Sequence, residues 1–270
     1  MNVGQIVDVL EELYPLDLAE DWDEPGLIVG NPQWGVRTIY CAVDPTEETV
    51  NDAIAHGAQL MITHHPLYFK ATHTVAGSTF RGALVTKLIE NHCALWVGHT
   101  NVDSAERGQG FAFIDVMGLK DQGPLVPHRD NPARGLGRIG KFDTPILLGD
   151  FALDIAHNLP HTESGVQVSG DPFQEISRVA VLPGSGDSEI MAAARSGADV
   201  YVTSDLRHHP VLDARQETGL AFINTPHAAI EKLVFNLMVQ DVPAAVRARY
   251  NEEIEMLITS INTDPWNVRF

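Results

Sequence analysis

Residues 57–66 read GAQLMITHHP, and residues 197–203 read GADVYVT, with a second His-His-Pro at residues 208–210. Each stretch is a glycine followed by a short apolar run that ends in threonine, a pattern typical of a buried strand after a turn. The near repeat indicates two similar halves of the chain. It also predicts imidazoles at the carboxyl ends of strands, where open sheets place their ligand sites.

Strands and helices are predicted to alternate in both halves. In the first half, three strands are predicted at residues 38–43, 60–63 and 94–98. Two helices separate them, one that begins after an N-cap at Asp44 or Thr46 and runs to about residue 56, and one at residues 82–91. This order is typical of a parallel sheet with helices on its faces. The sequence therefore predicts an α/β protein made of two similar α/β domains, with mostly parallel sheets flanked by helices, at residues 1–120 and 121–270.

Composition and charge disfavour several classes of function. The 270-residue chain has a formal net charge of −18 and a pI near 4.9, so its surface repels phosphate backbones and non-specific nucleic-acid binding is disfavoured. No apolar run approaches the roughly 20 residues of a membrane span, and no secretory signal is visible. Cys41 and Cys93 lie in apolar, strand-like runs and are expected to be buried thiols. A cytoplasmic location is the default expectation.

His64-His65-Pro66 is the first candidate site. Proline disfavours helical backbone at the residue before it, so His65 is held extended as the strand ends. Two imidazoles side by side can reach two neighbouring points, which suits metal binding. The alternative, in which one ring packs and the other is solvated, is the commoner outcome for such a dipeptide taken alone.

Two further segments carry side chains of the same kind. Residues 99–103 (HTNVD) follow a strand parallel to the first and should lie at the same sheet edge. Asp103 has two oxygens with which to bridge two cations, although an Asx-turn or helix-cap role for Asn101 or Asp103 is the alternative. His227 and Glu231 stand four residues apart at a predicted helix start, so both can reach one cation; a first-turn surface contact is the alternative.

Taken together, these side chains form a mixed nitrogen and oxygen ligand set without a thiolate, namely His64, His65, Asp103, His227 and Glu231. Such a set suits two first-row divalent ions such as Zn, Mn, Fe, Co or Ni. A pair of these ions about 3.5–4 Å apart activates water and stabilises developing negative charge. The first three ligands fall in the first predicted domain, and we expect the C-terminal helix that carries the other two to return to the domain interface.

Other motifs favour structural roles. Residues 184–186 (GSG) lie between a strand and a helix, as a phosphate nest does, but Asp187 and Glu189 place negative charge there, so a turn with a helix cap is predicted. The second His-His-Pro, at residues 208–210, lacks a partner motif like residues 99–103 and is interpreted as structural or as a pocket wall. No Gly-x-Ser-x-Gly elbow is present, which argues against a serine hydrolase.

Several motifs together resemble the signature of the NGG-interacting-factor-three family, whose bacterial members are named GTP cyclohydrolase I type 2 homologues. They are WDxxGLxVG at residues 22–30, ITHHPL at 62–67, HTNVD at 99–103, GLGRIG at 135–140, GADVYVT at 197–203 and HxxxE at 227–231. These motifs cover nearly the whole chain in the family's order.

The resemblance implies a two-domain α/β subunit, a dinuclear metal site near the domain interface and a toroidal homohexamer. Carried over by position, the family's ligands fall on the same five residues, with His99 beside the metals as a proton carrier or as an outer group. The chain departs from the family at residues 225–229 (TPHAA), where an aromatic side chain usually follows the histidine, and at Ser204, where glycine is usual.

Two functions remain open at this point. As an enzyme, the protein would use metal-activated water on a purine ring or a phosphate ester, with His99 as the candidate catalytic residue and a nucleotide as the small-molecule substrate. GTP ring opening is the activity that the resemblance implies, and Arg138 and Arg207 are the cations considered for its triphosphate. As a non-catalytic metal-handling or adaptor protein, it would store, deliver or sense metal.

Overall fold

The computed structural model describes residues 1–270 and divides into two compact units. Unit 1 comprises Met1–Val102 and Phe235–Thr263, and unit 2 comprises Asp103–Val234 and Asp264–Phe270. Each unit contains a sheet whose central strands run parallel, with helices packed on it, so the predicted α/β class is confirmed. The division differs from the single boundary expected near residue 120.

Unit 1 is built on a five-stranded sheet of order β1-β4-β3-β2-β13. Its strands are β1 (Gly26–Val29), β2 (Thr38–Ala42), β3 (Leu60–Thr63), β4 (Ala94–Val97) and β13 (Glu255–Ile258). Strands β4, β3, β2 and β13 run parallel, and β1 is an antiparallel edge. The three strands predicted in the first half of the chain therefore form the centre of this sheet.

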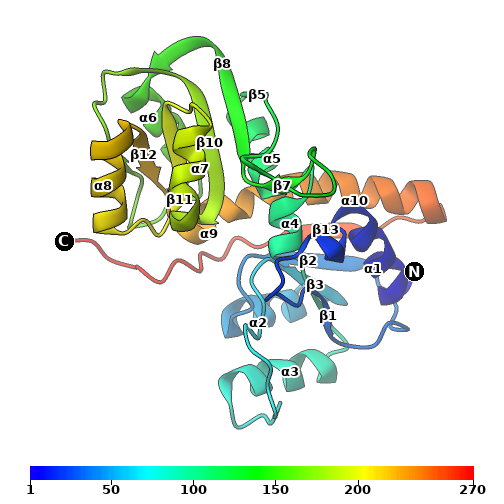
Figure 1. Ribbon diagram of the computed structural model, residues 1–270. Coiled ribbons are helices and arrows are strands. Elements are labelled where there is room, and N and C mark those ends of the chain that lie inside the picture. The colour runs from blue at the N-terminus through cyan, green and yellow to red at the C-terminus, as the bar shows by residue number, and fades with distance from the viewer. The chain divides into compact units, whose positions relative to one another are not determined.

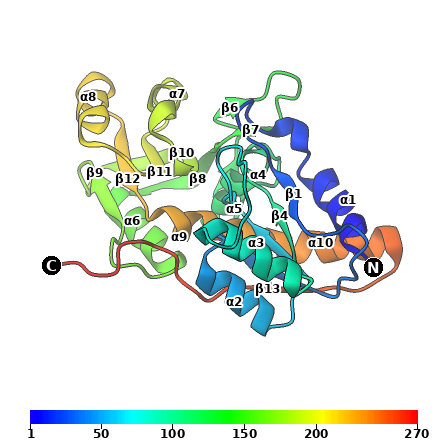
Figure 2. The same cartoon turned by 90° about the horizontal axis from the view of Figure 1, so that it is seen from below.

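Helices cover both faces of the sheet of unit 1. They are α1 (Val3–Leu13), α2 (Glu47–Ala55), α3 (Phe80–Glu90) and α10 (Phe235–Tyr250), with the 3-10 turn η1 (Leu16–Leu18) after α1. Figures 1 and 2 show α2 and α3 on one face, and α1 and α10 on the other. The start of α2 follows from its sequence, because Thr46 and Thr49 form a reciprocal cap and two glutamates occupy the first turn.

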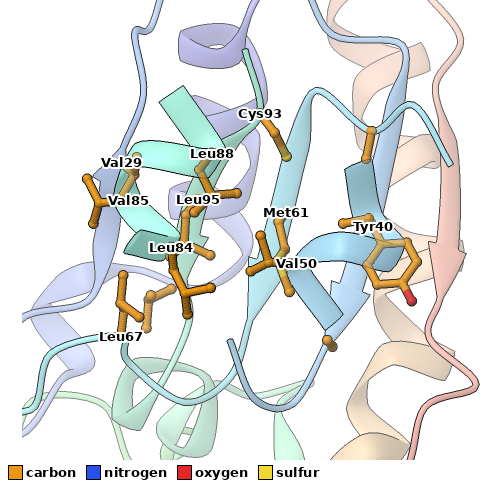
Figure 3. Packing of buried hydrophobic residues seen from close by; sticks show 14 residues of the cluster. Val29, Tyr40, Val50, Met61, Leu67, Leu84, Val85, Leu88, Cys93 and Leu95 are labelled. Atoms are coloured by element: carbon orange, nitrogen blue, oxygen red, sulfur yellow. The ribbon is translucent and has the colours of Figure 1, made fainter. Parts of the chain in front are cut away.

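The core between the sheet and helices α2 and α3 is apolar (Figure 3). Tyr40, Met61 and Leu95 lie in register on neighbouring strands and belong to one buried cluster with Leu88 of α3. Cys93 belongs to the same cluster, and burial raises the pKa of its thiol to about 12. This cysteine is therefore protonated and buried, as the sequence predicts.

Unit 2 is built on a six-stranded sheet of order β5-β8-β10-β11-β12-β9. Its strands are β5 (Lys120–Asp121), β8 (Arg138–Leu147), β9 (Gln167–Ser169), β10 (Glu175–Ser185), β11 (Val200–Ser204) and β12 (Ala221–Asn224). The central strands β10, β11 and β12 run parallel, while β5, β8 and β9 pair antiparallel. The short strands β6 (Val126–Pro127) and β7 (Gly135–Leu136) pair with each other.

The helices of unit 2 pack on this sheet. They are α5 (Gln109–Val116), α6 (Leu148–Asn158), α7 (Ile190–Arg195), α8 (His208–Thr218) and α9 (His227–Glu231), with the 3-10 turns η2 (Asp187–Glu189) and η3 (Lys232–Val234). Ala193 of α7 and Ala214 of α8 join Tyr201 and Phe222 of the sheet in one buried cluster. No helix of either unit combines the length and the apolar character that crossing a membrane requires.

The last part of the chain is arranged differently from the sequence-based expectation. The helix expected to continue from residue 227 is divided into α9, η3 and α10. Helix α10 packs on α1, and β13 covers the edge of β2 by parallel pairing, so residues 235–263 belong to unit 1. The second His-His-Pro forms the first turn of α8 and does not end a strand.

Leu88 and Ile89 of α3 are adjacent in sequence but are 0% and 47% exposed, respectively. We expect Leu88→Ala to lower the free energy of unfolding by about 2–5 kcal/mol, because it leaves a cavity in the core of unit 1. The matched control Ile89→Ala should change it by about 0.5 kcal/mol or less. Chemical denaturation followed by circular dichroism measures both, and equal losses would contradict the packing described.

Candidate metal centre

The predicted ligands of unit 1 lie at the carboxyl edge of its sheet. His64 and His65 follow β3 directly, and His99 follows the neighbouring parallel strand β4 after Gly98. The ring centroid of His64 lies 5.2 Å from that of His65 and 5.3 Å from that of His99. One nitrogen of each ring lies within 4.8 Å of a nitrogen of the other two. Parallel pairing of β3 and β4 thus gathers three imidazoles in one place.

Both histidines after β3 direct Nδ1 at an oxygen that can only accept a hydrogen bond. Nδ1 of His64 lies 2.8 Å from the carbonyl oxygen of Gly98, and Nδ1 of His65 lies 2.7 Å from Oδ1 of Asp44. Nδ1 therefore carries the proton, and the lone pair of the neutral ring is on Nε2. Histidine ligands of metals are fixed in this way by an outer hydrogen bond.

His99 is held by a buried carboxylate. Its Nδ1 lies 3.0 Å from Oδ2 of Asp23, whose side chain is 3% exposed. The same oxygen accepts hydrogen bonds from the N–H and the hydroxyl of Thr100, at 3.1 and 2.6 Å. Burial alone would raise the pKa of Asp23, but the hydrogen bonds from His99 and Thr100 outweigh it and lower the pKa to about 2. Asp23 is therefore ionised and orients His99 with its lone pair on Nε2.

Two predicted ligands of unit 2 share the short helix α9. His227 begins the helix and Glu231 ends it, and Nε2 of the histidine lies 2.9 Å from Oε1 of the glutamate. Nδ1 of His227 lies 2.7 Å from Oδ2 of Asp205, so this ring is oriented like those of unit 1. Glu231 is 3% exposed, a degree of burial that carboxylates tolerate when they are paired or coordinate a metal.

Gly184 of β10 lies against the Glu231 carboxylate. Its φ of +82° is in the left-handed region, and a Cβ at this position would collide with Oε1 of Glu231. An added side chain would therefore strain the backbone and would displace the carboxylate of the predicted ligand. The first glycine of the GSG turn makes room for a carboxylate rather than for a phosphate.

Asp103, the remaining predicted ligand, lies on the short helix α4 (Thr100–Ser104) after β4, and its Oδ1 atom is buried. The hydrogen bonds of the neighbouring Asn101 differ from the Asx-turn or helix-cap alternative, in which a side-chain oxygen accepts from an N–H two or three residues later. Its side-chain oxygen accepts from the N–H of His99 at 2.9 Å, and its amide donates to the carbonyl of Tyr14 at 2.8 Å. Asn101 thereby holds the loop that carries both His99 and Asp103.

Three acidic residues hold candidate histidines although the sequence indicates a functional role for none of them, not even for Asp23 within the WDxxGLxVG motif. Asp23, Asp44 and Asp205 each accept the Nδ1–H of a histidine. Asp44 comes two residues after β2 and Asp205 directly after β11, so both follow parallel strands as the histidines of unit 1 do. An acid at the end of a neighbouring strand is the signal that could have identified Asp44 and Asp205, whereas Asp23 lies in the loop before β1.

The two arginines considered for phosphate binding are engaged within unit 2. Arg138 is buried, donates to the carbonyl of Glu106 and lies 3.6 Å from the carboxylate of Asp121. Arg207 forms an ion pair with Asp187. Neither guanidinium is therefore arranged to receive a triphosphate.

The second His-His-Pro contributes a pocket wall, as one of its two interpretations predicts. His208 lines a cavity of about 450 Å³ together with Arg215 and Phe222. The rings of His208 and His209 are 5.0 Å apart, but this pair belongs to no cluster with metal-ligand geometry.

Comparisons with known proteins agree with the motifs and the fold. A family model described as Duf34/NIF3 (NGG1p interacting factor 3) matches residues 1–265. A Streptomyces coelicolor protein named GTP cyclohydrolase 1 type 2 homolog is 39% identical over 267 residues, which covers 98% of this chain and 93% of the relative. A crystal structure of a Staphylococcus aureus hypothetical protein is 28% identical, with a TM-score of 0.86 over 100% of this chain and 99% of that one. A Bacillus cereus protein related to NIF3 shares the fold, with a TM-score of 0.88 at 24% identity over 100% of this chain and 99% of that one.

Asp23→Asn tests the hydrogen bonds that hold His99. Folding lowers the pKa of Asp23 from its usual 3.8 to about 2, so the ionised carboxylate stabilises the fold by about 2 kcal/mol above about pH 4. This contribution is lost as the pH falls through the interval between the two values. We expect the variant to be about 2 kcal/mol less stable than wild type at pH 7, and the difference to shrink below about pH 3.

Denaturation curves at both pH values measure this difference. The matched control is Asp21→Asn at an exposed position two residues earlier, and it should show no comparable dependence on pH. A loss of stability in Asp23→Asn that stays the same at both pH values would contradict the assignment.

Proposed function

The chain belongs to the Duf34/NIF3 family, and on that premise we propose that it is a metal-dependent hydrolase. Its ligands for two divalent metal ions are His64, His65 and Asp103, together with His227 and Glu231. The mixed imidazole and carboxylate donors suit Zn, Mn, Fe, Co or Ni. The substrate is a nucleotide or another phosphate ester, and water is the attacking group.

The orientation of the histidines is the observation that carries this proposal. His64, His65 and His227 each have Nδ1 beside a carbonyl or carboxylate oxygen. In the two histidines of unit 1, Nε2 therefore carries a lone pair and no proton. The two Nε2 atoms cannot form a hydrogen bond with each other, whereas a divalent cation can accept both lone pairs. Glu231 adds an anionic oxygen next to Nε2 of His227 in unit 2. The residues present therefore fit divalent metal ions.

His99 is the proposed proton carrier. Metal ions of this kind lower the pKa of a coordinated water and stabilise negative charge on the reacting group. His99 accepts the proton of the attacking water at Nε2 and returns it to the leaving group. Asp23 stabilises the resulting imidazolium through Nδ1–H. Trp22 and Phe69 meet the His99 ring edge-on, each with a centroid distance of 5.8 Å, and restrict its rotation.

The pairing of Asp23 with His99 favours catalysis over metal handling. Aspartates also hold the ligands His65 and His227, but those carboxylates are 26% and 57% exposed. The Asp23 carboxylate that holds the additional histidine is 3% exposed and ionised, an arrangement that a storage or delivery site does not need. A general base needs that arrangement, because the aspartate fixes the tautomer and stabilises the protonated ring. We therefore place the metal-handling function second.

GTP ring opening is the first reaction to test, because relatives in Streptomyces coelicolor and Clostridium perfringens are named GTP cyclohydrolase 1 type 2 homolog. The proposal also includes assembly into a toroidal homohexamer and a cytoplasmic location. The assembly rests on the family resemblance, and the location rests on the sequence features described above.

Metal content tests the ligands, and turnover tests His99. We expect purified protein to carry about two divalent ions per chain, and His65→Ala and Asp103→Ala to lower that number in elemental mass spectrometry. His99→Ala should keep the ions but lower turnover by about 10²- to 10⁴-fold, the range expected when a general base is removed.

The matched control for these variants is His73→Ala at an exposed histidine, which should change neither metal content nor turnover. Wild-type protein that carries no metal, or a metal content that is unchanged in Asp103→Ala, would contradict the ligand assignment. Two ions without turnover of any nucleotide would identify a metal-handling protein instead.

Gly184→Ala provides an independent test of Glu231. A methyl group at this position displaces the Glu231 carboxylate, so we expect metal content after dialysis to fall. Gly197→Ala is the matched control, because its φ of +74° imposes similar backbone strain while nothing lies within 4 Å of the added Cβ. Both variants should lose about 1–2 kcal/mol of stability, but only Gly184→Ala should lose metal. Equal metal content in the two variants would argue against Glu231 as a ligand.

A further inference from the structure

A pocket lies beside helix α3 in unit 1. Residues of the connection from β3 to α3 and of the first turn of α3 line a volume of about 420 Å³. Small-molecule sites occupy about 300–1,000 Å³, so this pocket has the size for a small ligand. Its walls include Tyr68, Phe69, Lys70, Thr74, Phe80 and Arg81.

The pocket is positively charged although the chain is strongly acidic. Lys70 and Arg81 line it, and no aspartate or glutamate does. In a chain with a net charge of −18, two neighbouring cations without an acidic partner in their pocket form a local site for an anion. Arg138 and Arg207 differ in this respect, because each lies beside a carboxylate of its own unit.

Arg81 is also held in a fixed position. Its Nε donates to the carbonyl oxygen of Leu67 at 2.6 Å. The terminal nitrogens of the guanidinium keep their N–H donors for a ligand, and their planar fork matches the oxygens of a phosphate. Lys70 adds a point charge on a flexible stem, which can adjust to the same anion.

Aromatic side chains flank the two cations. Phe69 is 55% exposed and Phe80 is 57% exposed, so both phenyl rings can contact a ligand. Tyr68 also lines the pocket, with its hydroxyl buried. Apolar rings next to cations suit a ligand that carries both a planar ring and an anionic group.

One wall of the pocket leads to His99. Phe69 lines the pocket and also packs edge-on against the His99 ring, with an interplanar angle of 84°. A ligand anchored at Lys70 and lying on Phe69 would therefore approach the histidine proposed as the proton carrier.

We propose that this pocket binds the phosphate of a ring-bearing phosphate monoester, with Lys70 and Arg81 on the phosphate and Phe69 and Phe80 on the ring. Charge selects a monoester, because its phosphate carries about −1.5 to −2 at pH 7, which two cations neutralise. A triphosphate carries more negative charge than the pocket offsets. The assignment as a substrate site rests on the proposed function, whereas the binding of the phosphate does not.

Calorimetric titration of the protein as purified tests this site with phenyl phosphate, inorganic phosphate and benzoate. We expect phenyl phosphate to bind more tightly than either of the other two. Lys70→Gln and Arg81→Gln should each weaken its binding by about tenfold or more, the effect of losing a hydrogen bond to a charged group. Lys70→Arg should retain binding, and Lys141→Gln, at an exposed lysine of β8 in unit 2, should leave it unchanged.

Phenyl phosphate affinity that is unchanged in both glutamine variants would overturn the proposal, as would benzoate binding of equal strength. Metal content measured on the same samples distinguishes failure of the phosphate site from failure of the proposed function. If a glutamine variant loses phenyl phosphate binding but keeps its metal content, the loss is due to the pocket. Wild-type protein without metal would overturn the proposed function, while an affinity that depends on Lys70 and Arg81 would still establish the phosphate site.

Discussion

Continuation of the parallel hydrogen-bond ladder beyond the ends of β2 and β3 is the interaction on which the site of unit 1 depends. The N–H groups of His64 and His65 donate to the carbonyls of Ala42 and Val43, at 3.3 and 2.9 Å. The N–H of Gly98 donates to the carbonyl of Thr63 in the same way, at 2.9 Å. The sheet itself therefore sets the backbone positions from which the imidazoles project, and a loop could not hold them as rigidly.

Unit 2 uses the same arrangement at the end of its parallel strands. The N–H of Thr225 donates to the carbonyl of Thr203 at 2.9 Å, which aligns the chain that leads into His227. Asp205, placed just after β11, then orients that histidine, as Asp44 orients its partner in unit 1. The similarity that the repeated strand sequences indicate thus extends to the carboxylates, which act by fixing the tautomer of each ring.

The central strands and the candidate ligands could be predicted because their signals are local. Residues 60–63 are a continuous apolar run bounded by turn residues, and the histidines follow at once. The division into units could not be predicted, because it depends on strands β2 and β13 that pair across 217 residues of sequence. Asp44 also suits a helix start, and only the fold shows that it accepts from His65. Lys70 and Arg81 lie eleven positions apart in sequence, and only the folded loop places them in one pocket without a carboxylate.

The assignment of β13 and α10 to unit 1 has a consequence for how the chain folds during its synthesis. The strands of unit 2 lie within residues 120–224, an uninterrupted stretch, whereas unit 1 closes only when residues 235–263 have been made. Until then β2 keeps an unpaired edge, which is a site for association with other chains, and α1 lacks the helix that packs on it. The usual order, in which the N-terminal domain folds first on the ribosome, is therefore reversed. The second unit in the sequence is the first that can complete its sheet, and the strand that precedes His64 is held by a full sheet only near the end of translation.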